Sequence, residues 1–513
     1  MSLGRTQGVA LQGIEGVLVD VEAGLEQGLP KTMFSGLPDA ACRQAPDRIK
    51  AAATNSGVPI PNRRLTVNLS PASIPKVGSG WDLPIAIAAL AAAEVIKARV
   101  VDGIVHIGEL GLDGSIRPVR GVLPVVLTAA RLGMAQIVVP AANAAEAALV
   151  PGILVVPALH LRDLVARYQA IGRGEPPEEA VPIDPGVARD DIVVPDLRDV
   201  VGQDEARLAL EIAAAGRHHL FLSGPPGAGK TMLAERLPSL LPDLEPALAL
   251  EVTAIHSVLG ALPKSGALIV RPPFVAPHHG ASMPAIVGGG SGFIRPGAIS
   301  KAHHGVLFLD EAPEFKPGVL QALRQPVESG EVVVARASGV VRYPARFQLV
   351  LAANPCPCGR GVGKGIDCSC SPRARRDYMG KLAGPLLDRV DLQLQMRAVS
   401  RAGLFAPVGE SSARVAARVA TARGLQAERL ANTQWRLNGD VPGPVMREGF
   451  LKLPMAATVD LDRALERGVL TLRGYDRVLK IAWTVTDLAG GGTPNRGDVG
   501  LALTLRAQSA VAA

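Results

Sequence analysis

The sequence predicts an α/β protein with a helical part at its carboxyl end, and three observations lead to this prediction. The chain has 513 residues, long enough for roughly three domains of about 150 residues each. Apolar runs alternate with helical segments over residues 1–170 and again over 193–400, an order typical of α/β folds; in the second stretch we expect a doubly wound parallel sheet. From residue 401 to 513 the pattern is helical.

Composition excludes several classes of protein. Hydrophobic residues make up 48% and charged residues 20%, which excludes a mainly disordered or fibrous chain. The formal net charge of +7 does not by itself require a nucleic-acid partner, and aromatic residues, at 3%, offer few platforms for stacking bases. No signal peptide and no apolar run of about 18–20 residues is visible, so we expect a cytoplasmic protein without a membrane partner.

The elements follow in chain order. In the N-terminal part the runs LTVNL and GIVHIGEL predict strands, and residues 83–96 and 122–132 predict helices. Residues 171–192 hold four prolines and six acidic against two basic residues, and this net charge of −4 predicts an exposed linker. Further on, the run HHLFLSG predicts a strand, as do residues 305–309 and 347–352. Helices are predicted at 199–216, 411–430, 455–467 and 473–488.

A complete phosphate-binding motif follows the first of these later strands. Residues 224–231, GPPGAGKT, match G-x-x-x-x-G-K-[ST] between an apolar strand and a helix. Glycines let backbone N–H groups approach phosphate oxygens, Lys230 is expected to reach the β- and γ-phosphates, and Thr231 to bind Mg²⁺. The motif predicts ATP and Mg²⁺ as cofactors, held by Gly224, Pro225, Pro226, Gly227, Ala228, Gly229, Lys230, Thr231 and Met232.

Two further strands end in polar residues that suit the same site. The run VLFLDE ends in Asp310, a candidate Mg²⁺ ligand, and Glu311, a candidate base that polarises the attacking water. The run QLVLAAN ends in Asn354, which could orient that water. Because ligands bind at the carboxyl ends of the strands in doubly wound sheets, these side chains are expected to converge on Lys230.

Four of the five cysteines fall within fifteen residues, at Cys356, Cys358, Cys368 and Cys370. Four thiolates from two close pairs could make a tetrahedral Zn²⁺ site, although C-x-C is tighter than the usual spacing. With all four positions filled by protein, the role would be structural. The competing interpretation is four free thiols in a glycine-rich loop, and disulfides are disfavoured inside the cell.

These motifs, in this order, resemble an AAA+ ATPase. More specifically, RPPFVAPHHGASMPAIVGGG, PGAISKAHHGVLFLDEAPEF and NPCPCG…CSCSP…GPLLDRVDL resemble the ComM/YifB family of magnesium-chelatase-related proteins linked to DNA uptake. The resemblance implies a homo-hexameric ring that uses ATP to move DNA strands, as in branch migration during recombination of imported DNA. DNA, single-stranded or branched, is the implied partner, with recombination proteins as further partners.

The resemblance also assigns two arginines. Arg389, in LLDRVD, matches the arginine finger, which reaches the γ-phosphate in the neighbouring subunit. Arg473, in LTLRGYDRVLK, matches the sensor-2 arginine of a helical lid, with Arg477 one turn further on as its competitor. Both are expected to be catalytic, together with Lys230, Asp310, Glu311 and Asn354.

Two loops could face DNA. Residues 281–300 lie between the pairs His278–His279 and His303–His304, and the resemblance implies a pore-facing insert there, with Arg295 as a phosphate contact. Residues 327–341 alternate like a hairpin, and Arg336 and Arg342 could contact phosphates. The plainer interpretation of the histidine pairs is polar loop residues, since neighbouring side chains point in different directions.

Residues 75–83, PKVGSGWDL, resemble the active-serine segment of Lon-type proteases, and GELGLDGSIRPVRGVLPVVLTAARLG resembles the lysine segment. The serine position holds Gly80 and the lysine position Leu123, which implies a Lon-like fold that has lost the protease dyad. A Lon-like peptidase that uses Ser79 and Lys76 is a competing hypothesis. So are a magnesium-chelatase motor subunit and a non-catalytic scaffold, and the intact Lys230, Asp310 and Glu311 argue against the scaffold.

Overall fold

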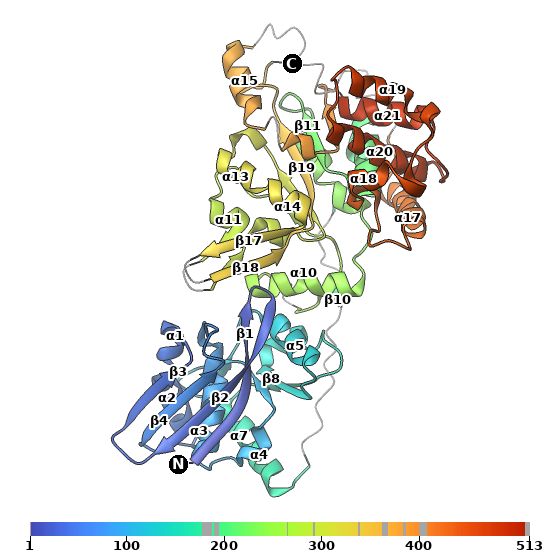
Figure 1. The fold of residues 1–513 in the computed structure, drawn as a ribbon. Coiled ribbons are helices and arrows are strands. Elements are labelled where there is room, and N and C mark those ends of the chain that lie inside the picture. Colours follow the sequence, from blue (N-terminus) through green and yellow to red (C-terminus); the bar gives the residue numbers. More distant parts are fainter. Residues whose placement is uncertain are drawn as a thin grey trace.

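The computed structural model describes residues 2–176, 187–188, 194–263, 265–290, 293–336, 339–361, 368–382, 386–399 and 408–507. We call 2–176 the N-terminal region, 194–399 the central region and 408–507 the C-terminal region. Figure 1 shows them in blue to cyan at the bottom, in green to yellow in the middle and in red at the upper right. The predicted α/β class with a helical carboxyl end is confirmed.

The N-terminal region is built on a mixed sheet of seven strands in the order β3-β4-β2-β1-β5-β8-β9. Strands β1 and β2 form a long antiparallel hairpin, and Gly13 at its turn has a φ of 75°, which favours glycine. Strand β4 joins β2 antiparallel, and the remaining pairs are parallel. The strands are β1 (Ser2–Gln12), β2 (Glu15–Glu26), β3 (Lys31–Ser35), β4 (Arg64–Ser70), β5 (Val105–His106), β8 (Gln136–Pro140) and β9 (Leu154–Ala158).

Helix α3 (Asp82–Ala92) is the core helix of this region, and all of its residues are buried. It ends before the predicted residue 96 because Glu94 takes a left-handed φ of 61°. A short ribbon, β6 (Glu109–Leu110) with β7 (Ile116–Arg117), follows it. The other helices are α1 (Ala40–Arg43), α2 (Ala45–Asn55), α4 (Ala98–Val101), α5 (Val122–Arg131), α6 (Ala144–Ala147) and α7 (Leu161–Arg173).

The predicted linker differs from the structure at its start. Residues 171–173 complete helix α7, which ends at Gly174 with a left-handed φ of 91°. Within the rest of the predicted segment, Val187–Ala188 (β10) pairs with Leu268–Ile269 (β12). Residues 177–186 and 189–192 lie outside the described part of the chain.

The central region holds a parallel sheet of five strands in the order β13-β16-β19-β11-β20. Alternate residues of its strands enter two different cores: Leu220 and Leu222 pack on one face, and Phe221 on the other. Both faces are covered, as the apolar runs predict. The strands are β11 (Leu220–Ser223), β13 (Phe274–Val275), β16 (Val306–Leu309), β19 (Gln348–Ala353) and β20 (Leu392–Gln395).

The helices of the central region lie around this sheet, and an insert precedes β16. The insert contains α11 (Met283–Val287), the ribbon of β14 (Gly288–Gly289) with β15 (Arg295–Pro296), and α12 (Ala298–Lys301). The predicted hairpin starts later than residue 327, because 324–329 form a helix; the hairpin is β17 (Glu331–Arg336) with β18 (Gly339–Pro344). The other helices are α8 (Asp204–Gly216), α9 (Lys230–Ala234), α10 (Pro246–Leu259), α13 (Pro317–Ala322), α14 (Arg324–Ser329) and α15 (Pro372–Gly380).

The C-terminal region is helical and docks on the sheet through a buried carboxylate. Asp391, only 1% exposed, lies next to β20 and accepts hydrogen bonds from the backbone N–H of His219 at 2.8 Å and from Arg477 at 2.7 Å. Burial opposes ionisation of Asp391, but Arg477 and neighbouring cations hold its pKa below its usual range. The helices are α17 (Ser412–Arg429), α18 (Gly443–Met446), α19 (Met455–Glu466), α20 (Leu472–Leu488) and α21 (Arg496–Ala507).

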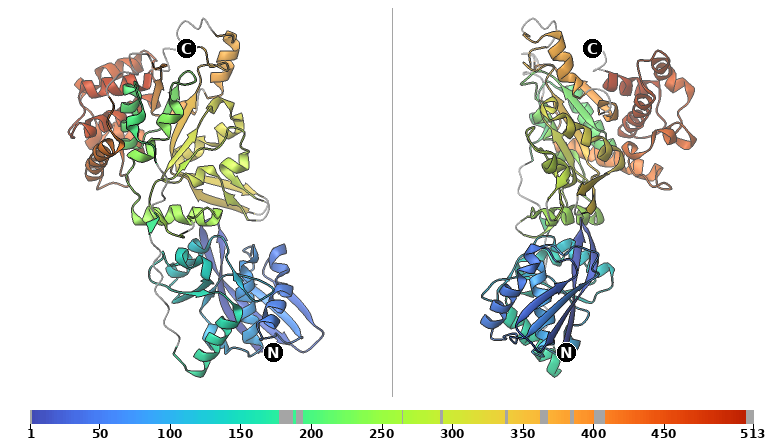
Figure 2. Two further views of the ribbon diagram at one scale, coloured as in Figure 1. Left: turned by 180° about the vertical axis from the view of Figure 1, so that it is seen from behind. Right: turned by 60° about the vertical axis from the view of Figure 1, so that its left-hand side comes forward.

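The N-terminal region contacts the central region mainly through its helix α5, which packs on α10 of the central region. In both views of Figure 2 the N-terminal region lies at the end of the molecule next to α10. The buried carboxylate of Glu146 accepts hydrogen bonds from the N–H of Leu123 in α5, from Asn143, and from the Ser257 hydroxyl of α10. Burial raises the pKa of Glu146. Ala254 of α10 lies in the same apolar cluster as Val122 and Val125, so the contact has an apolar core with one polar centre.

Candidate functional site

The phosphate-binding motif forms a loop between β11 and α9. Gly227 and Gly229 have φ values of 78° and 86°, left-handed conformations that favour glycine. Gln203, which is buried, donates to the carbonyl of Ala228 at 3.1 Å and braces the loop from outside the motif. Such a loop offers backbone N–H groups to an anion.

Lys230 is the centre of the candidate site. It is 8% exposed, and its Nζ donates to the carbonyls of Gly224 at 2.7 Å and Pro225 at 2.9 Å and to Oδ1 of Asn354 at 3.0 Å. Burial lowers its pKa, and the carboxylates of Asp310 and Glu311 oppose that shift. The structure therefore brings Asn354, at the end of β19, to the lysine of the loop, as the strand-end argument predicts.

Thr231 and Asp310 form the second contact of the site. The Thr231 hydroxyl donates to Oδ2 of Asp310 at 2.7 Å. A hydroxyl beside a carboxylate is a ligand pair that suits Mg²⁺, and the lysine that would neutralise phosphate oxygens lies next to it. The oxygen donors present thus fit a magnesium–nucleotide complex.

Glu311 follows Asp310 in a left-handed conformation with a φ of 49°. Such a backbone is unusual outside glycine and is enriched at functional sites. The Glu311 carboxylate lies 3.2 Å from Nδ1 of His279, whose ring is tilted by 34° against that of His278, with centroids 4.1 Å apart. His279 was expected to be a polar loop residue, and its contact with the candidate base is the main feature that the sequence analysis missed. The sequence carried no signal for this contact, because it depends on β13 and β16 being neighbours, which brings the residues after both strands to one sheet edge.

The other histidine pair also has an acidic partner. Nε2 of His303 and Nε2 of His304 lie 3.2 Å and 3.6 Å from the Glu251 carboxylate. These three side chains could hold a metal by distance. However, Nδ1 of His303 accepts the N–H of Arg346 at 3.0 Å, so in a neutral ring Nε2 carries the proton and donates to Glu251. The cluster is therefore better suited to joining α10 to the end of the insert.

Arg389 and Arg473 lie together, around Glu328 of α14. Nε of Arg389 is 2.8 Å from Oε1 of Glu328, and this arginine is 6% exposed. Arg473 is exposed, 3.9 Å from the same carboxylate and 3.4 Å from Asp388. Its competitor Arg477 is instead held by buried Asp391. The shared ion pair with Glu328 thus places Arg389 and Arg473 together.

The four clustered cysteines meet in space. The Sγ atoms of Cys356, Cys358 and Cys368 are 3.4–3.6 Å apart, and Cys370 completes a group whose ligand atoms lie within 4.8 Å of one another. A tetrahedral zinc with Zn–S bonds of about 2.3 Å requires sulfur separations of about 3.8 Å, so the thiols fit Zn²⁺. A hydrogen bond from the backbone N–H of Arg360, with contacts to the other thiols, lowers the pKa of Cys358 to about 6.

This cysteine cluster touches the phosphate-binding loop. Cys356 lies two residues beyond Asn354, and Gly359 has a left-handed φ of 75°. A Cβ atom at Gly359 would lie 2.6 Å from Cγ of Pro226, so only glycine fits this approach without displacement. The cluster can thus support both Asn354 and the loop.

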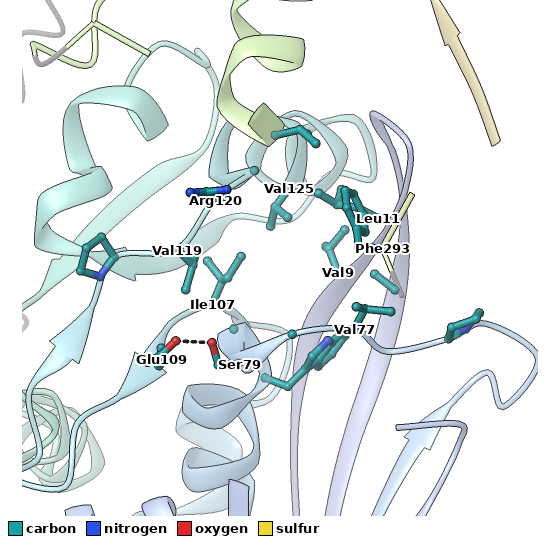
Figure 3. A pocket seen from close by; sticks show the side chains of 18 of the residues that line it. Val9, Leu11, Val77, Ser79, Ile107, Glu109, Val119, Arg120, Val125 and Phe293 are labelled. Carbon is teal, nitrogen blue, oxygen red and sulfur yellow. Dashed lines mark hydrogen bonds between the residues drawn. The ribbon is translucent and has the colours of Figure 1, made fainter. Parts of the chain in front are cut away.

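The Lon-like segments line a cavity of about 410 Å³ between the N-terminal region and the insert. Figure 3 shows Ser79 beside Glu109, to which its hydroxyl donates, with Val9, Ile107 and Phe293 on the walls. The Nζ of Lys76 donates elsewhere, to the carbonyl of Pro71. Ser79 and Lys76 therefore have separate partners, which argues against a serine–lysine peptidase.

The fold and the site define a P-loop protein of the AAA+ class. Family models agree: "Magnesium chelatase, subunit ChlI" matches residues 196–404, "Subunit ChlI of Mg-chelatase" 21–143, and "Magnesium chelatase, subunit ChlI C-terminal" 409–506. None of the described helices combines the length and apolarity needed to span a bilayer.

Relatives match over nearly the whole chain. An uncharacterised protein of Mycobacterium tuberculosis is 50% identical over 99% of both chains. The competence protein ComM of Haemophilus influenzae is 39% identical over 96% of this chain and 94% of its own, and the uncharacterised protein YifB of Escherichia coli is 40% identical over 95% and 94%. This chain belongs to the ComM/YifB family of magnesium-chelatase-related AAA+ ATPases.

A first prediction concerns His279. If Glu311 is the base for ATP hydrolysis, His279→Ala should raise the basal rate about two- to tenfold, since removing the imidazole contact, taken as worth about 0.5–1.5 kcal/mol, frees the carboxylate. Steady-state ATPase assays test this. His278→Ala is the matched control, because it removes the neighbouring ring, whose Nδ1 accepts the N–H of Gly280. Equal rates for both variants would contradict the prediction.

Proposed function

We propose that this chain is an ATP-driven DNA motor that works as a homo-hexameric ring and promotes branch migration during homologous recombination of imported DNA. The observation that carries the proposal is the convergence of Lys230, Thr231, Asp310 and Asn354 in a chain that aligns over 96% of its length with a competence protein. The convergence of these four side chains supports an ATPase motor. The alignment with a competence protein supports DNA as the substrate.

In this proposal the side chains at the carboxyl ends of the strands bind ATP and hydrolyse it. Lys230 and the loop N–H groups bind the ATP phosphates, Thr231 and Asp310 would hold Mg²⁺, and Glu311 takes a proton from water that Asn354 orients. Bound Mg²⁺ would neutralise part of the negative charge on the phosphates. Arg389 leaves Glu328 and reaches the nucleotide of the neighbouring subunit, and Arg473 acts as the sensor-2 arginine of the helical lid.

DNA contacts are proposed for the insert and the adjoining hairpin. Arg295 of β15 is exposed, and Arg336 of β17 approaches Gly289 of the insert: a Cβ there would lie 3.0 Å from its Nη2. Arg342 is held by Glu331 at 2.8 Å and is less available. Since His279 immediately precedes the insert and contacts Glu311, DNA bound here could change the position of the base.

A magnesium-chelatase motor subunit is the second candidate, favoured by the descriptions of the matching family models. The 38 kDa subunit of Rhodobacter capsulatus magnesium chelatase is 30% identical, but over only 30% of this chain and 49% of its own. The full-length match to ComM favours the DNA motor.

The proposal predicts ATP hydrolysis that DNA stimulates. Wild-type chain should hydrolyse ATP faster with branched or single-stranded DNA than without it. Glu311→Gln should retain nucleotide binding but lose about two or more orders of magnitude in rate, because it removes the general base. Strand exchange on a branched substrate should fail in the same variant. ATP hydrolysis that no DNA changes would contradict the DNA motor while leaving the ATPase intact.

A mixing experiment tests whether Arg389 acts between subunits. Lys230→Ala and Arg389→Ala should each be inactive, because one loses phosphate contacts and the other transition-state charge stabilisation. Mixed before assembly, they should regain part of the activity at interfaces that combine an intact Lys230 with an intact neighbouring Arg389. Arg467→Ala, at an exposed arginine of the C-terminal region, is the control for nonspecific loss. A mixture as inactive as its components would contradict action in trans.

We further propose that the four cysteines bind one structural Zn²⁺. Metal analysis of purified protein should find about one zinc per chain, and Cys368→Ser should lose it, because three thiolates bind zinc more weakly than four. ATP affinity should fall with the metal, since Gly359 packs on Pro226. Cys42→Ala is the matched control, a buried cysteine outside the cluster. Zinc retained in Cys368→Ser, or lost in Cys42→Ala, would refute the assignment.

A further inference from the structure

A second polar cavity lies at the amino-terminal ends of the strands of the central sheet, whereas Lys230 lies at their carboxyl ends. It has a volume of about 580 Å³, within the range of small-molecule sites. Its walls come from the segments just before β11 and β19, from the end of α14 and from the C-terminal region. Because the phosphate-binding loop follows the carboxyl end of β11, the two sites are separated by the length of the strands.

The walls of this cavity carry more positive than negative charge. Four cationic side chains line it, Arg217, Arg346, Arg477 and Lys480, against two carboxylates, Glu328 and Asp440. The carboxylates are engaged already, since Glu328 binds Arg389 and Asp440 binds Arg217 at 2.8 Å.

Two of these cations are available to a ligand. Arg346 is exposed, and the described residues include no carboxylate paired with it. Lys480 is 7% exposed, and its Nζ donates to the carbonyl of Gly439 at 3.0 Å. An ammonium has three donors, so hydrogens remain for an anion. Burial, reinforced by Arg477, lowers the pKa of Lys480 to about 8, a cost that a bound anion would relieve.

An aromatic wall adds a second kind of contact. Trp435, which is half-buried, lines the same cavity as Arg346 and Lys480. Indole rings stack on bases and on other planar groups. A cavity lined by cations and by an indole matches a ligand that has phosphate groups and a flat ring.

We propose that this cavity binds a free phosphate-bearing small molecule, pyrophosphate or a nucleoside polyphosphate, between the central sheet and the C-terminal helices. Arg346 and Lys480 would contact the phosphates, and Trp435 would lie against the base. Since both regions contribute walls, the ligand would hold them together. The inference does not depend on DNA being the substrate of the motor.

The test uses inorganic pyrophosphate and full-length chain carrying Lys230→Ala, which weakens phosphate binding at the first site. We expect saturable binding in calorimetry with about one pyrophosphate per chain, and ADP, which carries a base, should in addition change the tryptophan fluorescence. Trp81 and Trp483 are buried, 5% and 4% exposed. Adding Trp435→Phe should therefore abolish the fluorescence change while the calorimetric signal remains.

Arg346→Ala, added to the same chain, should weaken pyrophosphate binding about tenfold, as expected for losing a hydrogen bond between charged groups. This arginine is exposed, so folding should be unaffected; Lys480→Met is the second variant, compared by thermal melting. Arg467→Ala, an exposed arginine outside the cavity, is the matched control.

ADP binding more tightly than pyrophosphate would identify the nucleotide as the ligand, whereas equal affinities would identify the polyphosphate alone; both support the site. Absence of saturable binding would overturn the proposal. Equal affinity in the Arg346→Ala and Arg467→Ala chains, or binding of a short oligonucleotide without pyrophosphate binding, would also overturn it.

Discussion

The arrangement of the ATPase part depends on one buried ion pair, between Asp391 and Arg477. Asp391 also accepts the N–H of His219 just before β11, so a single carboxylate joins this strand of the sheet to the C-terminal helix α20. Breaking such a buried pair by removing one partner costs about 3–5 kcal/mol, because the remaining charge is left without compensation. The segment bearing Arg389 immediately precedes Asp391, so its position depends on the same contact.

The proposed functional side chains gather at two places. At the carboxyl edge of the sheet, Lys230 and Asp310 lie where we propose that the nucleotide binds, and the cysteine cluster contacts the loop from the side. In α14, Glu328 forms an ion pair with Arg389, the proposed arginine finger. In the proposed ring, Arg389 has to leave Glu328 before it reaches a phosphate of the next subunit, so this ion pair would compete with the contact between subunits.

Sequence patterns predicted the parts that depend on local order. Apolar runs buried on both faces, a glycine-rich turn and polar strand ends predicted the parallel sheet and the meeting of Lys230 with Asn354. The contact between His279 and Glu311 could not be found in this way, because it requires knowing that β13 and β16 are neighbours. The same is true of Glu328, an ordinary acid on a short helix that becomes a partner of Arg389 only through packing.

The carboxylate of Glu146 has a consequence for how this protein can be divided. Its donors come from α5 of the N-terminal region and from Ser257 of the central region, so neither side completes the environment of this carboxylate alone. A fragment that stops after α7 would expose an apolar patch around Val122 and a carboxylate that has lost a donor. Among relatives, a change at position 257 should accompany a change at position 146, since the Ser257 hydroxyl donates a hydrogen bond to the Glu146 carboxylate across the boundary between the two regions.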